Sequence, residues 1–253
     1  MHTCFHPNLN PGVFELTEDE ALHVVRVLRM KEGDAVRLMD GTGGVAFGEL
    51  VGVGKRQASV RVEKVSRSAQ RPLGLSLIVS PTKHTDRFEW LVEKATELGV
   101  KEIVPVWTRH SERRTDKHGR WSKVVVAATK QCHRAWMPLL HEACPLDEVF
   151  ERHPHLNEVQ GAVAHCDGAL SSVPVRMGWP EWQMNHANAW LAIGPEGDFS
   201  DEEIEWLHSC GATPVHLGTL RLRTETAGIA AVAQFTMNQC CLLYTSPSPR
   251  DRG

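Results

Sequence analysis

The chain has 253 residues, a formal net charge of −3 and 42% hydrophobic residues, values that fit a folded protein with a substantial core. This charge excludes nucleic-acid binding through a global positive field, so any such contact must use local basic patches. Seven cysteines, an odd number without C-x-x-C spacing, argue against a disulfide framework and a zinc site, so we expect no metal. The sequence contains no run of about 18–20 uncharged apolar residues and no signal-peptide pattern, which favours a cytoplasmic protein that does not enter a membrane.

Residues 1–68 are expected to form a small β-rich domain. Short β-type segments at Ala35–Met39, Val45–Val51 and Ser59–Val65 are separated by glycine-containing turns. One amphipathic helix, Glu18–Arg29, interrupts them. The pattern suggests a small β-barrel, and the polar stretch Ser66–Arg71 suits a linker.

Residues 74–241 predict a second domain, in which apolar strands alternate with helices. This alternation indicates an α/β fold with a parallel, doubly wound sheet. The first helix, Asp86–Leu98, has apolar residues at helical spacing, with Asp86 as its predicted N-cap and Gly99 just after its end. The expected strands are residues 75–80, 102–107, 161–166, 189–193 and 214–217.

Residues 242–253 have two Ser-Pro steps and no periodicity, so they are left out of the fold prediction. Two interpretations remain for this tail: a non-native extension or a natural disordered end.

The loop after the strand at residues 189–193 has the sequence GPEGDFS. Gly194 and Gly197 flank Pro195 and Glu196, so the chain can turn sharply there and expose its peptide groups. Ser200 and Glu203 predict a capping box that opens the helix Asp201–Cys210. The loop fits either a ligand cradle or a tight turn that binds nothing.

A second loop, LGTLRLRTETAG at residues 217–228, follows the next strand. Arg221 and Arg223 alternate with leucines, so the leucines can pack inward while the arginines face a groove. Glu225 lies at the start of a small-residue helix, Ala227–Gln239. Two such loops in succession favour one ligand held by backbone groups, although Arg223 and Glu225 could also form a simple ion pair.

Local charge points to nucleic acid. Residues 109–134 contain eight Lys or Arg residues against Glu112 and Asp116, with tryptophans nearby that could stack on bases. Arg26 and Arg29 form a second basic group in the first domain, and Lys83 and Arg87 lie at a strand-to-helix turn. Either patch alone could be a solvated face, but two patches on separate domains favour a shared RNA groove. The predicted RNA-binding residues are Arg26, Arg29, Lys83, Arg87, Arg113, Arg114, Lys130 and Arg134.

The two loops, in this order, resemble the RsmE family of SPOUT-class RNA methyltransferases. Four further segments are similar to that family and extend the resemblance over residues 1–241: HVVRVLRMKEGD (23–34), SPTKHTDRFEWLVEKATELGV (80–100), SER (111–113) and TKQCHRAWMP (129–138). One departure is Asp198, which stands where a second glycine is common.

The resemblance implies a PUA-like β-barrel followed by a SPOUT-type parallel sheet with a C-terminal trefoil knot. It also implies a homodimer that uses S-adenosyl-L-methionine to methylate N3 of a uridine in 16S ribosomal RNA of the small subunit. Arg223 and Glu225 are the expected catalytic residues, a cation for the base and a proton acceptor. The residues expected to bind the cofactor are Leu191, Gly194, Pro195, Glu196, Gly197, Leu217, Gly218, Leu220, Leu222 and Thr226.

Two other functions remain open at this point. A Rossmann-type nucleotide or NAD enzyme is disfavoured because no strand is followed by G-x-G-x-x-G. A non-catalytic RNA-binding module would keep the basic patches but lack affinity for the cofactor.

Overall fold

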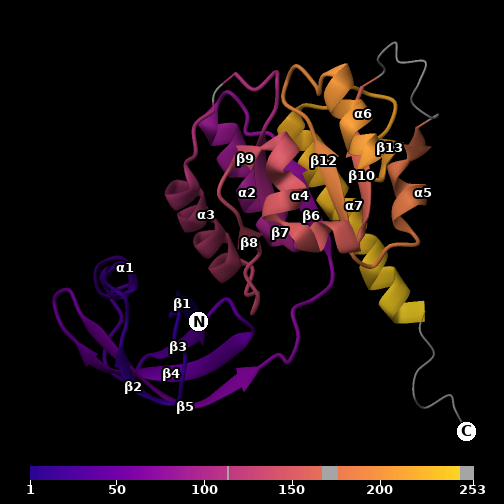
Figure 1. Ribbon diagram of the computed structural model, residues 1–253. Coiled ribbons are helices and arrows are strands. Elements are labelled where there is room, and N and C mark those ends of the chain that lie inside the picture. The colour runs from indigo at the N-terminus through magenta and orange to yellow at the C-terminus, as the bar shows by residue number, and fades with distance from the viewer. Residues whose placement is uncertain (113, 167–175, 246–253) are drawn as a thin grey trace, which may run out of the picture. The chain divides into compact units, whose positions relative to one another are not determined.

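The computed structural model describes residues 1–112, 114–166 and 176–245, and the chain divides into two compact units (Figure 1). Unit 1 comprises Met1–Pro72 together with Val126–Met137. Unit 2 comprises Leu73–Val125 and Pro138–Gly253. The first unit therefore includes a segment that lies far from it in the sequence.

Unit 1 contains a five-stranded, mostly antiparallel sheet. Its strands are β1 (His2–Phe5), β2 (Gly12–Glu15), β3 (Ala35–Met39), β4 (Gly44–Val53) and β5 (Ala58–Arg67), in the order β1-β3-β4-β5-β2. Only the β1–β3 pair among them is parallel. The three predicted strands are confirmed, and β5 takes in two residues that we assigned to the linker. Closure into a barrel stays a prediction.

The helix predicted over Glu18–Arg29 was partly wrong. An α-helix, α1 (Glu18–Leu22), passes into a π-helical turn, η1 (His23–Val27), where the amide of Leu28 donates to the carbonyl of His23 (3.0 Å). Arg29 then adopts a left-handed conformation with φ 54°, which ends the helix before it. Hydrophobic periodicity could not reveal this, because it does not distinguish the two hydrogen-bond patterns.

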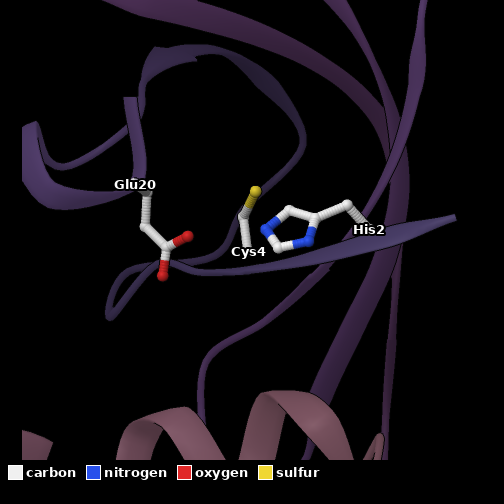
Figure 2. Close-up of side chains that lie close together, drawn as sticks. All are labelled: His2, Cys4 and Glu20. Atoms are coloured by element: carbon white, nitrogen blue, oxygen red, sulfur yellow. The ribbon is translucent and has the colours of Figure 1, made fainter. Parts of the chain in front are cut away.

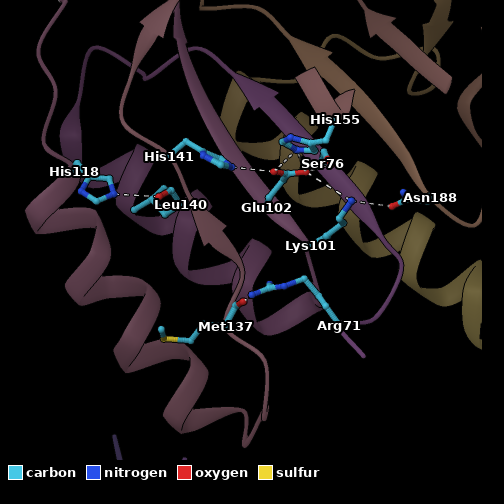
Figure 3. Close-up of polar contacts among 10 residues, drawn as sticks. All are labelled: Arg71, Ser76, Lys101, Glu102, His118, Met137, Leu140, His141, His155 and Asn188. Atoms are coloured by element: carbon cyan, nitrogen blue, oxygen red, sulfur yellow. Dashed lines mark hydrogen bonds and ion pairs between the residues drawn. The ribbon is translucent and has the colours of Figure 1, made fainter. Parts of the chain in front are cut away.

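Polar contacts join the segment Val126–Met137 to the rest of unit 1. This segment contains the end of α3 (His118–Gln131). Lys130 Nζ lies 2.6 Å from Glu20 Oε1, and Arg37 Nη2 donates to the carbonyl of His133 (3.0 Å). Arg71 Nη1 donates to the carbonyl of Met137 (2.7 Å; Figure 3).

Unit 2 is built on a parallel sheet. Its strands are β6 (Leu75–Val79), β7 (Glu102–Trp107), β8 (Leu139–Leu140), β9 (Cys144–Pro145), β10 (Gln160–Ala164), β11 (Met177–Gly178), β12 (Ala189–Ile193) and β13 (Ala212–His216). The order is β11-β13-β10-β12-β6-β7-β8, with β9 pairing with β7, and every pair is parallel. All five predicted strands are confirmed to within two residues. Continuous apolar runs such as AWLAI predict buried parallel strands well.

Helices lie on both faces of this sheet, as the α/β prediction required (Figure 1). One layer contains α2 (Thr85–Leu98) and α7 (Thr224–Thr245), and α5 (Trp179–Gln183) also contacts α7. The opposite layer contains α6 (Asp201–Ser209) and α4 (Val149–Arg152), with the short 3₁₀ turns η2 (Leu146–Glu148) and η3 (Pro154–Glu158). Trp190 of β12 is buried in that layer and its ring packs on Phe150 (5.1 Å between centroids).

Helix ends were predicted with mixed success. The capping box of α6 is confirmed, because Ser200 Oγ accepts from the amide of Glu203 and the Glu203 carboxylate accepts from the amide of Ser200. Gly99 ends α2 with φ 103°, also as predicted. The N-cap prediction at Asp86 was wrong, since α2 begins at Thr85 after an extended His84. Helix α7 begins three residues before the predicted Ala227, so the second loop is shorter than the sequence suggested, and residues 242–245 of the predicted tail belong to α7.

A buried carboxylate organises the amino-terminal end of the unit 2 sheet. Glu102, at the start of β7, is fully buried and contacts Ser76, Lys101, His141 and His155 (Figure 3). Burial alone would raise the pKa of Glu102, but hydrogen bonds from His141 and Ser76 and the charge of His155 outweigh it and lower the pKa to about 2. The carboxylate therefore stays ionised and links three segments at this end of the sheet.

No helix among residues 1–112, 114–166 and 176–245 is long and apolar enough to cross a membrane.

Candidate active site

A cavity of about 860 Å³ opens at the carboxyl ends of β10, β12 and β13. Its lining includes Ala164 from β10, Ile193 from β12 and Val215 from β13. Strand β12 follows β10 in the chain but lies between β10 and β6 in the sheet. In parallel α/β sheets, ligands bind at the carboxyl ends of strands where the strand order reverses, so this cavity lies where such a site is expected.

The first loop reaches the cavity as a closely packed turn. A Cβ built on Gly194 would come within 2.9 Å of the backbone nitrogen of Phe199, so only glycine fits there without moving the loop. Asp198 has φ 64°, a left-handed conformation that aspartate tolerates better than most side chains.

Hydrogen bonds hold Asp198 in this conformation. Its Oδ1 accepts from the amide of Phe199 (2.8 Å), and its Oδ2 accepts from the amide of Cys166 just beyond β10 (2.7 Å). His110 Nδ1 donates to the Asp198 carbonyl (3.0 Å). The departure from glycine at this position therefore has a local explanation: an aspartate can adopt the same backbone conformation and also connect the loop to β10.

The two loops are joined through Thr224, the first residue of α7. Its buried Oγ1 donates to the carbonyl of Gly194 (3.0 Å). The first loop is thus hydrogen-bonded to the start of α7, the helix that follows the second loop.

Arg87 also bridges the two loops. Its Nη1 lies 3.6 Å from Glu196 Oε1 in the first loop, and its Nε lies 3.8 Å from Glu225 Oε1 after the second. Glu225 is 5% exposed, and its Oε2 is a buried atom without a hydrogen-bond partner. The ion pair expected as an alternative, between Arg223 and Glu225, is not found among the described residues, where Glu225 faces Arg87 instead.

Most of the predicted cofactor residues lie at this cavity, and their role stays a prediction. Leu191, Gly197 and Thr226 are outside its lining: Leu191 is fully buried in β12, whereas Gly197 and Thr226 are exposed. Of the two predicted catalytic residues, Arg223 lines the cavity and is exposed. Glu225 is buried, is not part of the lining and faces Arg87, which is. The predicted residues that line the cavity are Gly194, Pro195, Glu196, Leu217, Gly218, Leu220 and Leu222.

The predicted RNA-binding residues have varied environments, and their role is also untested. Arg26, Arg29 and Arg114 are exposed. Lys83 pairs with Glu112 (2.7 Å), and Lys130 pairs with the buried Glu20. Arg134 is half-buried, and this burial lowers the pKa of its guanidinium. Arg113 lies outside the described residues.

Sequence reasoning missed the contribution of β10 to the site. Ala164, His165 and Cys166 line the cavity, as does Arg176, which donates to the His165 carbonyl (2.6 Å). The predicted strand at residues 161–166 contained the signal, because its carboxyl end must lie at the same edge as the two loops. The order of strands in the sheet was needed to use that signal.

Comparison with known proteins places the chain in a family. Residues 69–236 match the family model described as an RNA methyltransferase domain, and residues 16–63 match the RNA methyltransferase PUA domain. The chain belongs to this RNA methyltransferase family. Membership confirms the resemblance found in the sequence, and it decides against the Rossmann-type NAD enzyme.

Relatives within the family carry a more specific name. Ribosomal RNA small subunit methyltransferase E of Rickettsia conorii is 29% identical over 229 residues, covering 87% of this chain and 88% of that protein. The protein of the same name from Synechocystis is 30% identical over 221 residues, covering 87% and 71%. The crystal structure of a ribosomal RNA small subunit methyltransferase E from Neisseria gonorrhoeae, bound to S-adenosyl methionine, is 26% identical with a TM-score of 0.79, covering 94% of this chain and 97% of that one.

Proposed function

We propose that this chain transfers the methyl group of S-adenosylmethionine to N3 of a uridine in 16S ribosomal RNA of the small subunit. The observation that carries the proposal is the cavity at the carboxyl ends of β10, β12 and β13, formed by the two loops that resemble the RsmE family. Membership of an RNA methyltransferase family and the cofactor bound by the Neisseria relative support it.

The residues present fit the cofactor. A volume of about 860 Å³ lies within the range of about 300–1,000 Å³ typical of small-molecule sites. Gly218 brings its backbone to the cavity with open space where a Cβ would be, Gly194 allows the first loop to pack tightly at the cavity wall, and Leu217, Leu220 and Leu222 offer apolar surface to an adenine ring. When bound there, S-adenosylmethionine would supply an electrophilic methyl group, so the reaction needs neither a metal nor a redox cofactor.

The chain's own residues would orient the uridine and remove its proton. N3 of uridine is a weakly acidic imide nitrogen and a poor nucleophile while protonated, so methyl transfer requires loss of the N3 proton as the new N–C bond forms. Arg223 at the cavity wall can stabilise the negative charge that develops on O2 or O4. Glu225 is the proposed proton acceptor, because its Oε2 is a buried oxygen that has no donor.

The contact between Glu225 and Arg87 also allows another role, in which the carboxylate only holds Arg87 in place. The two roles predict different kinetics. If Glu225 is the proton acceptor, Glu225→Gln should lower kcat and change the pH–rate profile, whereas Arg87→Gln should leave that profile unchanged. If Glu225 acts only through Arg87, the single variants and the double variant would show the same loss, since the two residues form one unit.

The decisive experiment incubates the full chain and S-adenosylmethionine with small ribosomal subunits that lack the modification. Mass spectrometry of nucleosides from the product RNA should detect N3-methyluridine. Methylation at another position would overturn the assignment of N3 as the methylated atom. Measurable cofactor binding without any methylation would overturn the assignment of the RNA substrate. No heat of cofactor binding in calorimetry would favour the non-catalytic RNA-binding module. Near-normal turnover of both Arg223→Ala and Glu225→Gln would refute their catalytic roles.

The remaining features implied by the family resemblance form part of the same proposal: a C-terminal trefoil knot around the cofactor, a PUA-like barrel that contacts RNA, and a homodimer in the cytoplasm. Sedimentation of the full chain tests the dimer. Charge-reversal variants of the exposed Arg26 and Arg114 test RNA contact, because loss of a phosphate contact should weaken binding and lower its salt dependence.

A further inference from the structure

A cluster in unit 1, remote in sequence from the loops of the cavity, brings together three side chains of types that can bind a metal ion. His2 and Cys4 are on β1, where residues two apart face the same side, and Glu20 is on α1. One ligand atom from each side chain lies within 4.8 Å of the other two. Figure 2 shows the imidazole of His2 and the carboxylate of Glu20 on either side of the Cys4 sulfur.

Two polar atoms of these side chains are buried without a hydrogen-bond partner. They are Nε2 of His2 and Oε2 of Glu20, while Cys4 is fully buried between them. Buried nitrogen and oxygen atoms are nearly always paired, because burial removes the water that would otherwise bind them. Two such atoms beside one buried sulfur therefore suggest a site that is completed by a bound ion.

The other oxygen of Glu20 is already occupied, which fixes the carboxylate. Glu20 Oε1 accepts from the amide of Phe5 (3.2 Å) and from Lys130 Nζ (2.6 Å). Oε2 is thereby left as the carboxylate oxygen without a partner. Outer contacts of this kind orient the ligands in established metal sites.

We propose that His2, Cys4 and Glu20 bind one Zn²⁺ ion that joins β1 to α1. An imidazole nitrogen, a thiolate and a carboxylate form a ligand set that zinc accepts, whereas Mg²⁺ and Ca²⁺ prefer oxygen ligands alone. Zinc–ligand bonds are about 2.0–2.3 Å, so the three atoms need to approach one another by only about 1 Å. On binding, the Cys4 thiol loses its proton to solvent, and the thiolate and carboxylate together balance the charge of the ion.

The absence of C-x-x-C spacing argued against a zinc site and led us to expect no metal. The proposed ligands are instead at positions 2, 4 and 20, and folding of α1 against β1 brings them together.

Cobalt provides the test, because Co²⁺ replaces Zn²⁺ and gives a near-ultraviolet charge-transfer band when a thiolate binds it. The full chain, without an affinity tag, is reduced, stripped with a chelator and titrated with Co²⁺. We expect one Co²⁺ per chain with this band, and displacement of the band by Zn²⁺. Cys4→Ser should abolish the band, whereas Cys144→Ser, which alters another fully buried cysteine in unit 2, should leave it unchanged.

His2→Gln and Glu20→Gln provide tests that keep all the cysteines. Loss of a residue that only hydrogen-bonds to a metal ligand lowers metal affinity by roughly 10- to 100-fold. Because His2 and Glu20 would bind the ion directly, each substitution should lower Zn²⁺ affinity by more than this. Zn²⁺ should also raise the thermal midpoint of the wild type but not that of Cys4→Ser. A band that survives in Cys4→Ser, or a wild-type chain that takes up no Co²⁺, would overturn the proposal.

Discussion

Gly194→Ala tests whether close packing of the first loop shapes the cavity. The added Cβ would lie 2.9 Å from the nitrogen of Phe199 and 3.1 Å from the carbonyl carbon of Asp198. Both are backbone atoms, so no side-chain rotation can relieve the contact. The backbone of the loop itself must shift.

The cost of that movement follows from what holds the loop. Asp198 is fixed by its hydrogen bonds to Phe199 and Cys166, and Ser200 is fixed by the capping box. Overpacking against such a framework costs about 1–3 kcal/mol. If the strain falls on the conformation that binds the cofactor, the affinity for S-adenosylmethionine drops about 5- to 150-fold.

Calorimetry with S-adenosylmethionine measures this loss, and urea unfolding measures any part that appears as lower stability. Gly197→Ala should have a smaller effect, because its Cβ would meet the side chain of His110 at 3.2 Å rather than backbone. Gly119→Ala, on the open surface of α3, should bind like the wild type. Wild-type affinity and stability in Gly194→Ala would refute the packing argument.

Three further predictions concern unit 2. Thr224→Val should lower the free energy of unfolding by about 1–2 kcal/mol, because the Gly194 carbonyl loses its buried donor, whereas Thr224→Ser should retain most of it; equal values would contradict this. Gly161→Ala should cost about 1–3 kcal/mol or more in urea unfolding, since its Cβ would meet Trp190 at 1.9 Å, and a neutral effect would show that the indole moves freely. Burial and the neighbouring His141 and His155 lower the pKa of His153 from 6.5 to about 4, so the unfolded chain binds more protons and stability should fall as the pH drops from 6.5 to 4. Between pH 7 and pH 5 the loss should be about 1 kcal/mol for this half-buried group, and His153→Gln should reduce it; an unchanged pH dependence in the variant would refute the assignment.

Five of the eight strands of unit 2 could be predicted because their own residues are mostly apolar, as buried strands require, whereas the two-residue strands β8, β9 and β11 are too short to show a pattern. A strand with helices on both faces is apolar at every position, and β12 is buried throughout. The capping box of α6 is equally local, since Ser200 and Glu203 are three residues apart. Such features need no knowledge of the rest of the fold.

The features that were missed depend on residues distant in sequence. Strand β1 contains polar residues and is completed by pairing with β3, thirty-four residues later, as His2 opposite Val36 shows. Glu102 is ionised and buried because Ser76, His141 and His155 converge on it from separate segments. Arg87 was predicted to bind RNA, and only the structure shows that it lies between Glu196 and Glu225.

The charges around the cavity reconcile a chain of net charge −3 with an RNA substrate. Arg87 is balanced by Glu196 and Glu225, and the Asp198 carboxylate is held by backbone amides. Arg221 and Arg223, which also line the cavity, form no ion pair with any described residue. We therefore propose that these two charges meet a phosphate or the base, so that the second loop attracts RNA locally in a protein whose net charge is negative.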